Sequence, residues 1–154
     1  MAENPTRQLV VFKLAGEEYA LPIEQVHEII RFSEPRAVTS DDPAVRGVIS
    51  LRGRILPVFD LATRLGAPST EIGETTRVVV VESDDDMLGV IVDSVAAVMT
   101  VDCAAVAPAP GANPVAVEGV VRLDERLLVL LDARAVGGLE APAAEALEDP
   151  ANAA

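Results

Sequence analysis

The 154-residue sequence is poor in basic and aromatic side chains. It has 12 Lys and Arg against 25 Asp and Glu, a formal net charge of −13 at pH 7, and it contains no Trp, one Tyr and three Phe. A protein that binds nucleic acid needs a basic face, and often aromatic rings on which bases stack. The composition therefore argues against nucleic acid and, for the same electrostatic reason, against anionic membrane surfaces. A charged partner should be locally basic.

Cysteine and histidine each occur once, as Cys103 and His27. A single cysteine excludes an internal disulfide and suits a reducing compartment, and we expect Cys103 to be a small buried apolar residue. His27 has Glu24 and Glu28 nearby, so a metal ligand is conceivable, but a solvated histidine is expected. The sequence therefore predicts no cofactor, no metal and no histidine-based catalytic centre.

Long apolar runs are also missing. No stretch approaches the ~20 apolar residues of a membrane span, and the start, Met1 to Pro5, lacks the basic and apolar segments of a signal peptide. We therefore expect a cytoplasmic protein that does not insert into membranes. Half of the residues are hydrophobic, which is enough for the core of one domain or of two small half-domains.

The most informative stretch, Gly47 to Leu61, consists of two short apolar runs separated by Arg52-Gly53-Arg54. This pattern predicts a β-hairpin with a basic tip, where Gly53 can adopt a positive φ angle. Read alone, the tip could be only a solvated turn. The flanking residues should fill buried strands: Val48, Ile49, Leu51, Ile55, Leu56, Val58 and Phe59.

A second copy of this hairpin runs from Gly119 to Asp132. Six positions are identical between the copies at constant spacing: Gly47, Val48, Leu51, Arg54, Leu56 and Asp60 match Gly119, Val120, Leu123, Arg126, Leu128 and Asp132. The tip differs, because Asp124-Glu125 replaces Arg52-Gly53, and Val129 replaces Pro57, whose missing N–H suggests an edge or a bulge. Shared positions indicate the fold, and differing positions are candidates for function.

The remaining segments repeat as well. Residues 9–14 and 19–21 predict an opening hairpin, and 77–81 with 87–98 predict its second copy, joined by an acidic turn at 82–86. Between Pro22 and Phe32, one turn of helix followed by a strand competes with a short helix. Residues 40–43 are typical of a helix start. Two all-β halves of about five strands each predict a pair of small barrels packed together.

Asp60 and Asp132 occupy equivalent places and allow two interpretations. A pseudo-twofold axis could bring the two carboxylates together for acid–base catalysis, as in aspartic proteases. The residues that follow each of them instead resemble a helical turn, whose N–H groups an aspartate caps. Capping is the favoured interpretation, and a small two-barrel enzyme using Asp60 and Asp132 is the alternative.

The signature hairpin resembles the Asn-Leu-Arg-Gly-x-x-x-Pro-x-x-Asp-Leu motif of the CheW family, with Ser50 in place of the usual Asn. The resemblance extends from about Leu9 to Val136. It implies an all-β fold of two five-stranded SH3-like barrels on a shared core, with short connecting helices. Residues 1–137 would form the domain, with one barrel mainly from about 9–66 and the other mainly from about 76–136, strand exchange between them being left open. Residues 138–154 are rich in Ala, Glu and Pro, and this composition predicts a mostly disordered acidic tail, with a short helix around 143–147 left open.

The same resemblance implies a non-enzymatic adaptor that couples chemoreceptors to the histidine kinase CheA, recruited to membrane-associated arrays. The tip of the receptor would occupy a groove between the barrels, and the regulatory domain of CheA another surface. A scaffold for another receptor–kinase array, controlling pili or development, is the alternative. The positions that match the family pattern are Arg52, Gly53, Val78, Gly89 and Val95 for the receptor, and Val26 and Glu28 for the kinase.

Overall fold

The computed structural model describes residues 5–83, 86–108, 117–123 and 125–133, which form eleven strands. Their bounds are β1 (Thr6–Leu14), β2 (Glu17–Pro22), β3 (Val26–Arg31), β4 (Val45–Leu51), β5 (Arg54–Asp60), β6 (Arg77–Ser83), β7 (Asp86–Val92), β8 (Ser94–Asp102), β9 (Val106–Ala107), β10 (Val117–Leu123) and β11 (Arg126–Leu131). One α-helix, α1 (Leu61–Arg64), and two 3₁₀ turns, Ile23–Gln25 and Cys103–Ala105, connect them. The described chain is all-β, as the sequence predicts.

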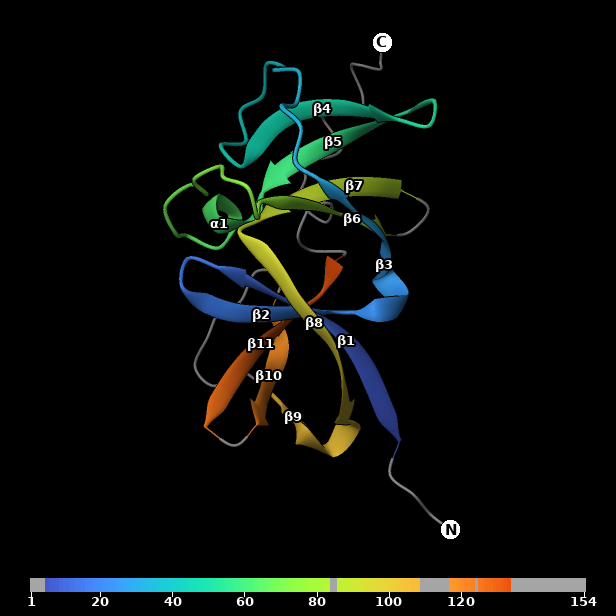
Figure 1. The fold of residues 1–154 in the computed structure, drawn as a ribbon, viewed down its shortest axis with the longest axis vertical. Helices are drawn as coiled ribbons and strands as arrows, with labels where there is room; N and C mark the ends of the chain where they lie inside the picture. The colour runs from blue at the N-terminus through green and yellow to red at the C-terminus, as the bar shows by residue number, and fades with distance from the viewer. Residues whose placement is uncertain (1–4, 84–85, 109–116, 124, 134–154) are drawn as a thin grey trace.

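The strands form two sheets, one above the other in Figure 1. We name barrel A the sheet with strand order β8-β1-β2-β11-β10-β9, and barrel B the sheet with order β3-β6-β7-β5-β4. Barrel B closes where Arg36, beyond the end of β3, exchanges two backbone hydrogen bonds of 2.8 and 2.9 Å with Val48 of β4. Barrel A closes in the same way, since β9 follows β8 in the chain and pairs with β10. Barrel A has five strands like barrel B when β8 and β9, which are separated by the turn Cys103–Ala105, are counted as one interrupted strand. The predicted all-β fold of two barrels is therefore confirmed, and the arrangement is consistent with the SH3-like form.

The two copies of the sequence repeat exchange their opening hairpins. Hairpin β1–β2 joins β8, β10 and β11 in barrel A, whereas hairpin β6–β7 joins β3, β4 and β5 in barrel B. Each hairpin joins the strands of the other copy, its host, through a parallel strand pair, β5 with β7 in barrel B and β11 with β2 in barrel A. The two pairs have equivalent registers, since Val58 pairs with Gly89 and Leu130 with Ala20. Neither barrel therefore coincides with one continuous stretch such as 9–66 or 76–136.

Apolar side chains form three clusters, one inside each barrel and one between them. Strand β7 shows why: Met87 and Ile91 point into barrel B, whereas Leu88, Val90 and Val92 point into the layer shared with barrel A. Because the sheets are covered on both faces, strands such as β6 read as unbroken runs of valine instead of alternating with polar residues.

The repeated glycines, Gly47 and Gly119, are required where the closing segment crosses each barrel. A Cβ atom at Gly47 would lie 2.2 Å from the carbonyl oxygen of Arg36, and one at Gly119 would lie 2.6 Å from that of Ala107. Gly47 also has a φ of +146°, in a region that L side chains rarely adopt. The glycine is therefore identical in the two copies because the fold leaves no room for a side chain at this position.

Some local expectations from the sequence are wrong. Residues 40–43 form a turn, because the Asp42 carboxylate accepts from the Ala44 N–H at 3.0 Å and leads the chain directly into β4. Cys103 is half-buried in a 3₁₀ turn that the Asp102 carboxylate caps. Pro57 lies in β5, which has neighbours on both sides, so the expected edge strand is wrong, although the pairing of β5 with β7 begins only at Val58. The bulge of this hairpin lies on the opposite strand, between Val45 and Gly47.

Other expectations lie outside the described residues: the tail 138–154 with its short helix, the linker residues 109–114, the acidic turn residues 84–85, and Asp124 of the second hairpin tip. Among the described residues, no helix is both long enough and apolar enough to cross a membrane.

Candidate protein-interaction site

The tip of hairpin β4–β5 holds its arginine in an unusual backbone conformation. Arg52 has a φ of +51° and Gly53 a φ of +83°, the combination that a two-residue type I′ turn requires. Glycine or asparagine is the usual residue at such a position, and the left-handed region costs another residue about 1 kcal/mol. Arg52 is held there with 70% of its side chain exposed, and because such backbone conformations cluster at functional sites, its role as a contact residue stays a prediction that this geometry favours.

Arg52 forms an ion pair with Glu28 of β3. The pKa of Arg52 is raised because its guanidinium donates a hydrogen bond to this carboxylate. The Glu28 carboxylate also lies 3.9 Å from Nε2 of His27, which is exposed as expected. The structure thus brings together one residue that the family resemblance assigns to the receptor side and one that it assigns to the kinase side.

Beside this pair, Arg54 and Ile55 border a recess of about 290 Å³ between β5 and β7. The Arg54 guanidinium lies over the sulfur of Met87, with 3.0 Å between Nη1 and Sδ. Ile55 is 68% exposed, so its expected burial is wrong. The exposure of Ile55 could not be predicted, because the residues after it form an unbroken apolar run. Such a run lacks the alternation of apolar and polar residues that distinguishes the two faces of a strand.

The other predicted residues lie at different depths. Val26 and Val95 are partly buried against the cluster between the barrels, at equivalent places on β3 and β8. Val78 is 1% exposed and packs inside barrel B. Gly89 is buried beside it, and a Cβ there would lie 2.7 Å from Cγ1 of Val78. In this chain Val78 and Gly89 therefore set the close packing of β6 on β7, and their part in binding stays a prediction.

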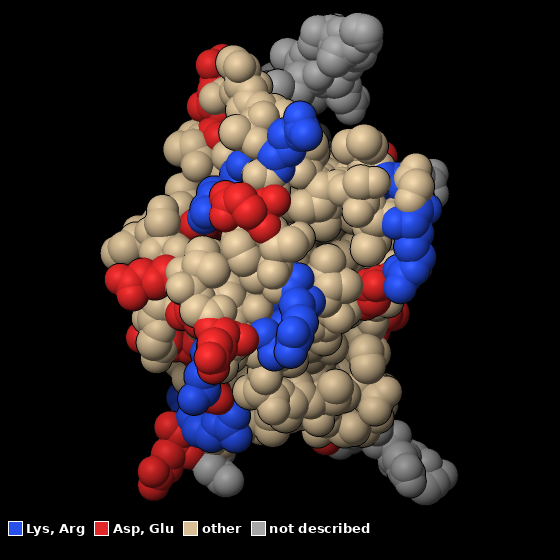
Figure 2. All heavy atoms as spheres, turned by 45° about the horizontal axis from the view of Figure 1, so that its top comes forward, with Lys and Arg blue, Asp and Glu red and all other residues tan. Residues whose placement is uncertain are grey.

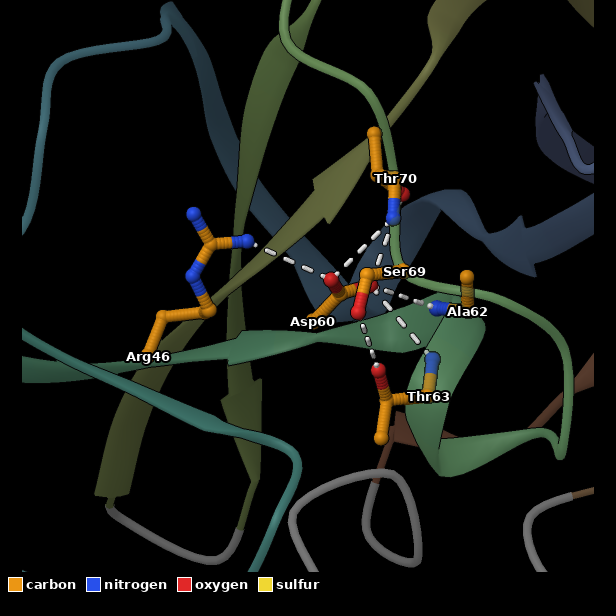
Figure 3. A network of polar contacts seen from close by, with 6 residues as sticks. All are labelled: Arg46, Asp60, Ala62, Thr63, Ser69 and Thr70. Carbon is orange, nitrogen blue, oxygen red and sulfur yellow. Dashed lines mark hydrogen bonds and ion pairs between the residues drawn. The ribbon is translucent and has the colours of Figure 1, made fainter.

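Asp60 has the capping role favoured from the sequence (Figure 3). Its side chain is 1% exposed and accepts from the N–H groups of Ala62 at 3.1 Å, Thr63 at 3.4 Å and Thr70 at 3.2 Å. Arg46 donates to the second carboxylate oxygen at 3.3 Å. These contacts fasten the start of α1 and the loop after it, which fits a structural carboxylate better than a catalytic one.

Charged groups are dispersed on one face of the molecule. On the face shown in Figure 2, basic and acidic side chains lie in small mixed groups separated by broad uncharged areas. Within the described ranges, no cluster of three or more His, Cys, Asp or Glu could hold a metal ion. Local ion pairs beside exposed apolar residues are typical of protein–protein contacts.

Comparisons with known proteins agree with this arrangement. A family model described as "CheW-like domain" matches residues 8–139. The chain is 37% identical over 125 residues to the chemotaxis protein CheW of Bacillus subtilis, covering 79% of this chain and 80% of that protein. It is 31% identical over 132 residues to CheW of Klebsiella aerogenes, covering 83% and 80%. The crystal structure of the scaffolding protein TtCheW from Thermoanaerobacter tengcongensis superposes with a TM-score of 0.78 at 31% identity, covering 82% of this chain and 89% of that one. The chain therefore belongs to the CheW family of scaffold and adaptor proteins.

Proposed function

We propose that this protein is a non-enzymatic adaptor that couples chemoreceptors to the histidine kinase CheA in bacterial chemotaxis signalling. It works in the cytoplasm, where receptor arrays recruit it to the membrane without insertion of its own chain. Family membership and coverage of most of the chain support this proposal. The observation that carries it is the exposed tip of the signature hairpin, where Arg52 is tied to Glu28.

The arrangement suggests how one small surface serves two partners. Arg52 is the leading receptor contact and Glu28 a kinase contact, and their ion pair makes the orientation of each side chain depend on the other. An arginine suits this place because its planar fork can hold Glu28 and still offer donors to a second group. Val26 and Val95 border the two sides of the layer between the barrels, and Val78 and Gly89 lie inside barrel B, where they set the packing of β6 on β7.

The proposal is tested by combining the purified protein with CheA and a chemoreceptor from the same genome in vesicles, and measuring kinase autophosphorylation from ATP. Activity should rise only when all three components are present. Arg52→Ala should abolish most of the rise and weaken receptor binding by about thirtyfold, as loss of a central arginine commonly does. Its melting temperature should stay within about 2 °C of the wild type, because the side chain is exposed.

Arg126→Ala is the matched control in the second copy and should leave coupling unchanged. Failure of the wild-type protein to bind either CheA or the receptor would refute the proposal. If only receptor–kinase pairs from arrays that control pili or development respond, the alternative scaffold function is correct.

A further inference from the structure

Two equivalent arginines, one at the end of each barrel, have different partners. Arg126 and Arg54 occupy matching positions of the repeated hairpin, and the parallel registers make Glu18 and Met87 equivalent neighbours. In barrel A the Arg126 guanidinium donates from Nε and Nη2 to the two oxygens of Glu18, at 2.9 and 2.8 Å. In barrel B the thioether of Met87, a weak acceptor, stands where that carboxylate would be.

Among the described residues, Arg54 is therefore a cation without a carboxylate counterion. No carboxylate of the described residues lies within ion-pairing distance of Arg54, although Asp86 lines the same recess. The sulfur engages one donor of a guanidinium that has five, arranged to grip a carboxylate with two parallel hydrogen bonds. Arg126, at the equivalent position of hairpin β10–β11, makes such a pair of hydrogen bonds with Glu18. The repeated hairpin can therefore present a guanidinium in the geometry that a carboxylate needs.

A second difference between the barrels opens the recess. In barrel A the parallel pairing of β11 with β2 includes Val129 and Tyr19, whereas in barrel B the pairing of β5 with β7 begins only at Val58. The residue equivalent to Val129 is Pro57, which has no N–H to donate. The strands consequently separate one residue earlier, and the exposed side chain of Ile55 lies at the opening.

We infer that a partner protein supplies the missing carboxylate, inserting an Asp or Glu side chain beside Met87 to pair with Arg54 while a neighbouring apolar side chain covers Ile55. This inference rests on the proposed function in assigning the partner, which is the regulatory domain of CheA. The expected kinase contact Glu28 is held by Arg52, two residues from Arg54 on the same hairpin. The recess is lined by Leu56 and Met87 of the interior of barrel B and by Phe59 and Leu88 of the layer between the barrels. The assignment of the kinase as the partner therefore rests on the neighbouring Glu28.

The geometry can be tested without any partner. Met87→Glu recreates in barrel B the pair that barrel A has, so it should destabilise the protein less when Arg54 is present than in an Arg54→Ala background. A double-mutant cycle of melting temperatures measures this coupling, and the Glu18→Met and Arg126→Ala cycle is the reference. Absence of coupling between positions 54 and 87 would overturn the inference, because Arg54 could not then hold a carboxylate there.

The partner is tested by calorimetric titration of the full-length protein with purified CheA regulatory domain. Arg54→Ala should weaken binding at least tenfold, and a folded Met87→Glu variant should do so as well, because it fills the site from within. Arg126→Ala should stay within twofold. Failure of the wild type to bind refutes the proposed function but leaves the coupling test standing. Unchanged binding by Arg54→Ala, or a loss confined to receptor binding or to self-association, overturns the inference.

Discussion

Replacing Asp60 by alanine should destabilise the protein strongly although the residue takes part in no predicted binding surface. The substitution removes the cap of α1, which is worth about 1 kcal/mol. It also leaves the buried N–H of Thr70 without its acceptor, at a further cost of about 2 kcal/mol. Arg46 adds little, because 28% of its side chain is exposed and water can replace the ion pair. The total of about 3 kcal/mol should lower the melting temperature by about 10 °C.

Thermal unfolding followed by circular dichroism measures this change. Asp60→Asn should lose about half as much, since its amide oxygen can still accept from Ala62 and Thr63. Partner binding by the folded fraction should remain close to that of the wild type. A melting temperature within about 2 °C of the wild type, together with a loss of activity or binding, would refute the structural role and favour the interpretation of Asp60 as a functional carboxylate.

Three further predictions concern other parts of the chain. Gly47→Ala should lower the melting temperature by about 10 °C, because its Cβ would overlap the Arg36 carbonyl, whereas Gly73→Ala, with open space around it, should shift it by less than about 2 °C. The pKa of Glu18 is lowered by its hydrogen bonds to Arg126, so the melting-temperature difference between wild type and Glu18→Gln should be full at pH 7 and vanish as the pH falls through that lowered pKa; a constant difference would contradict this. Removal of residues 138–154 should leave coupling intact and change the melting temperature by less than about 4 °C, and a larger fall would mean that the tail docks on the domain.

The sequence could predict the repeated all-β architecture because identical residues recur where the backbone demands them. Gly47 and Gly119 mark the crossings of the closing segments, and Asp60 marks the start of a helical turn. The sequence could not predict which hairpin pairs with which host. The exchanged and unexchanged arrangements would use the same side chains, turns and local periodicity, so nothing in a window of ten or twenty residues distinguishes them.

The candidate site was only partly predictable for a related reason. Arg52 stood out because the two hairpin tips differ there. Its partner Glu28 lies 24 residues away, and the contrast between Arg54 and Arg126 depends on Met87 and Glu18, which belong to the other copy in each case. Only the assembled barrels place these residues together.

Because the hairpins are exchanged, each barrel is built from strands of both halves of the chain. If the chain were cut in the connection between α1 and β6, each fragment would carry a hairpin with no host and a host with no hairpin. Neither could form the observed pairing alone, and the two would have to reassemble in trans to restore it. Likewise, a half-length chain could reproduce this pairing by exchanging hairpins with a second molecule, as in domain swapping. The chain thus has the architecture of a swapped dimer whose two halves have been joined end to end, and a substitution in either hairpin alters the barrel built by the opposite half.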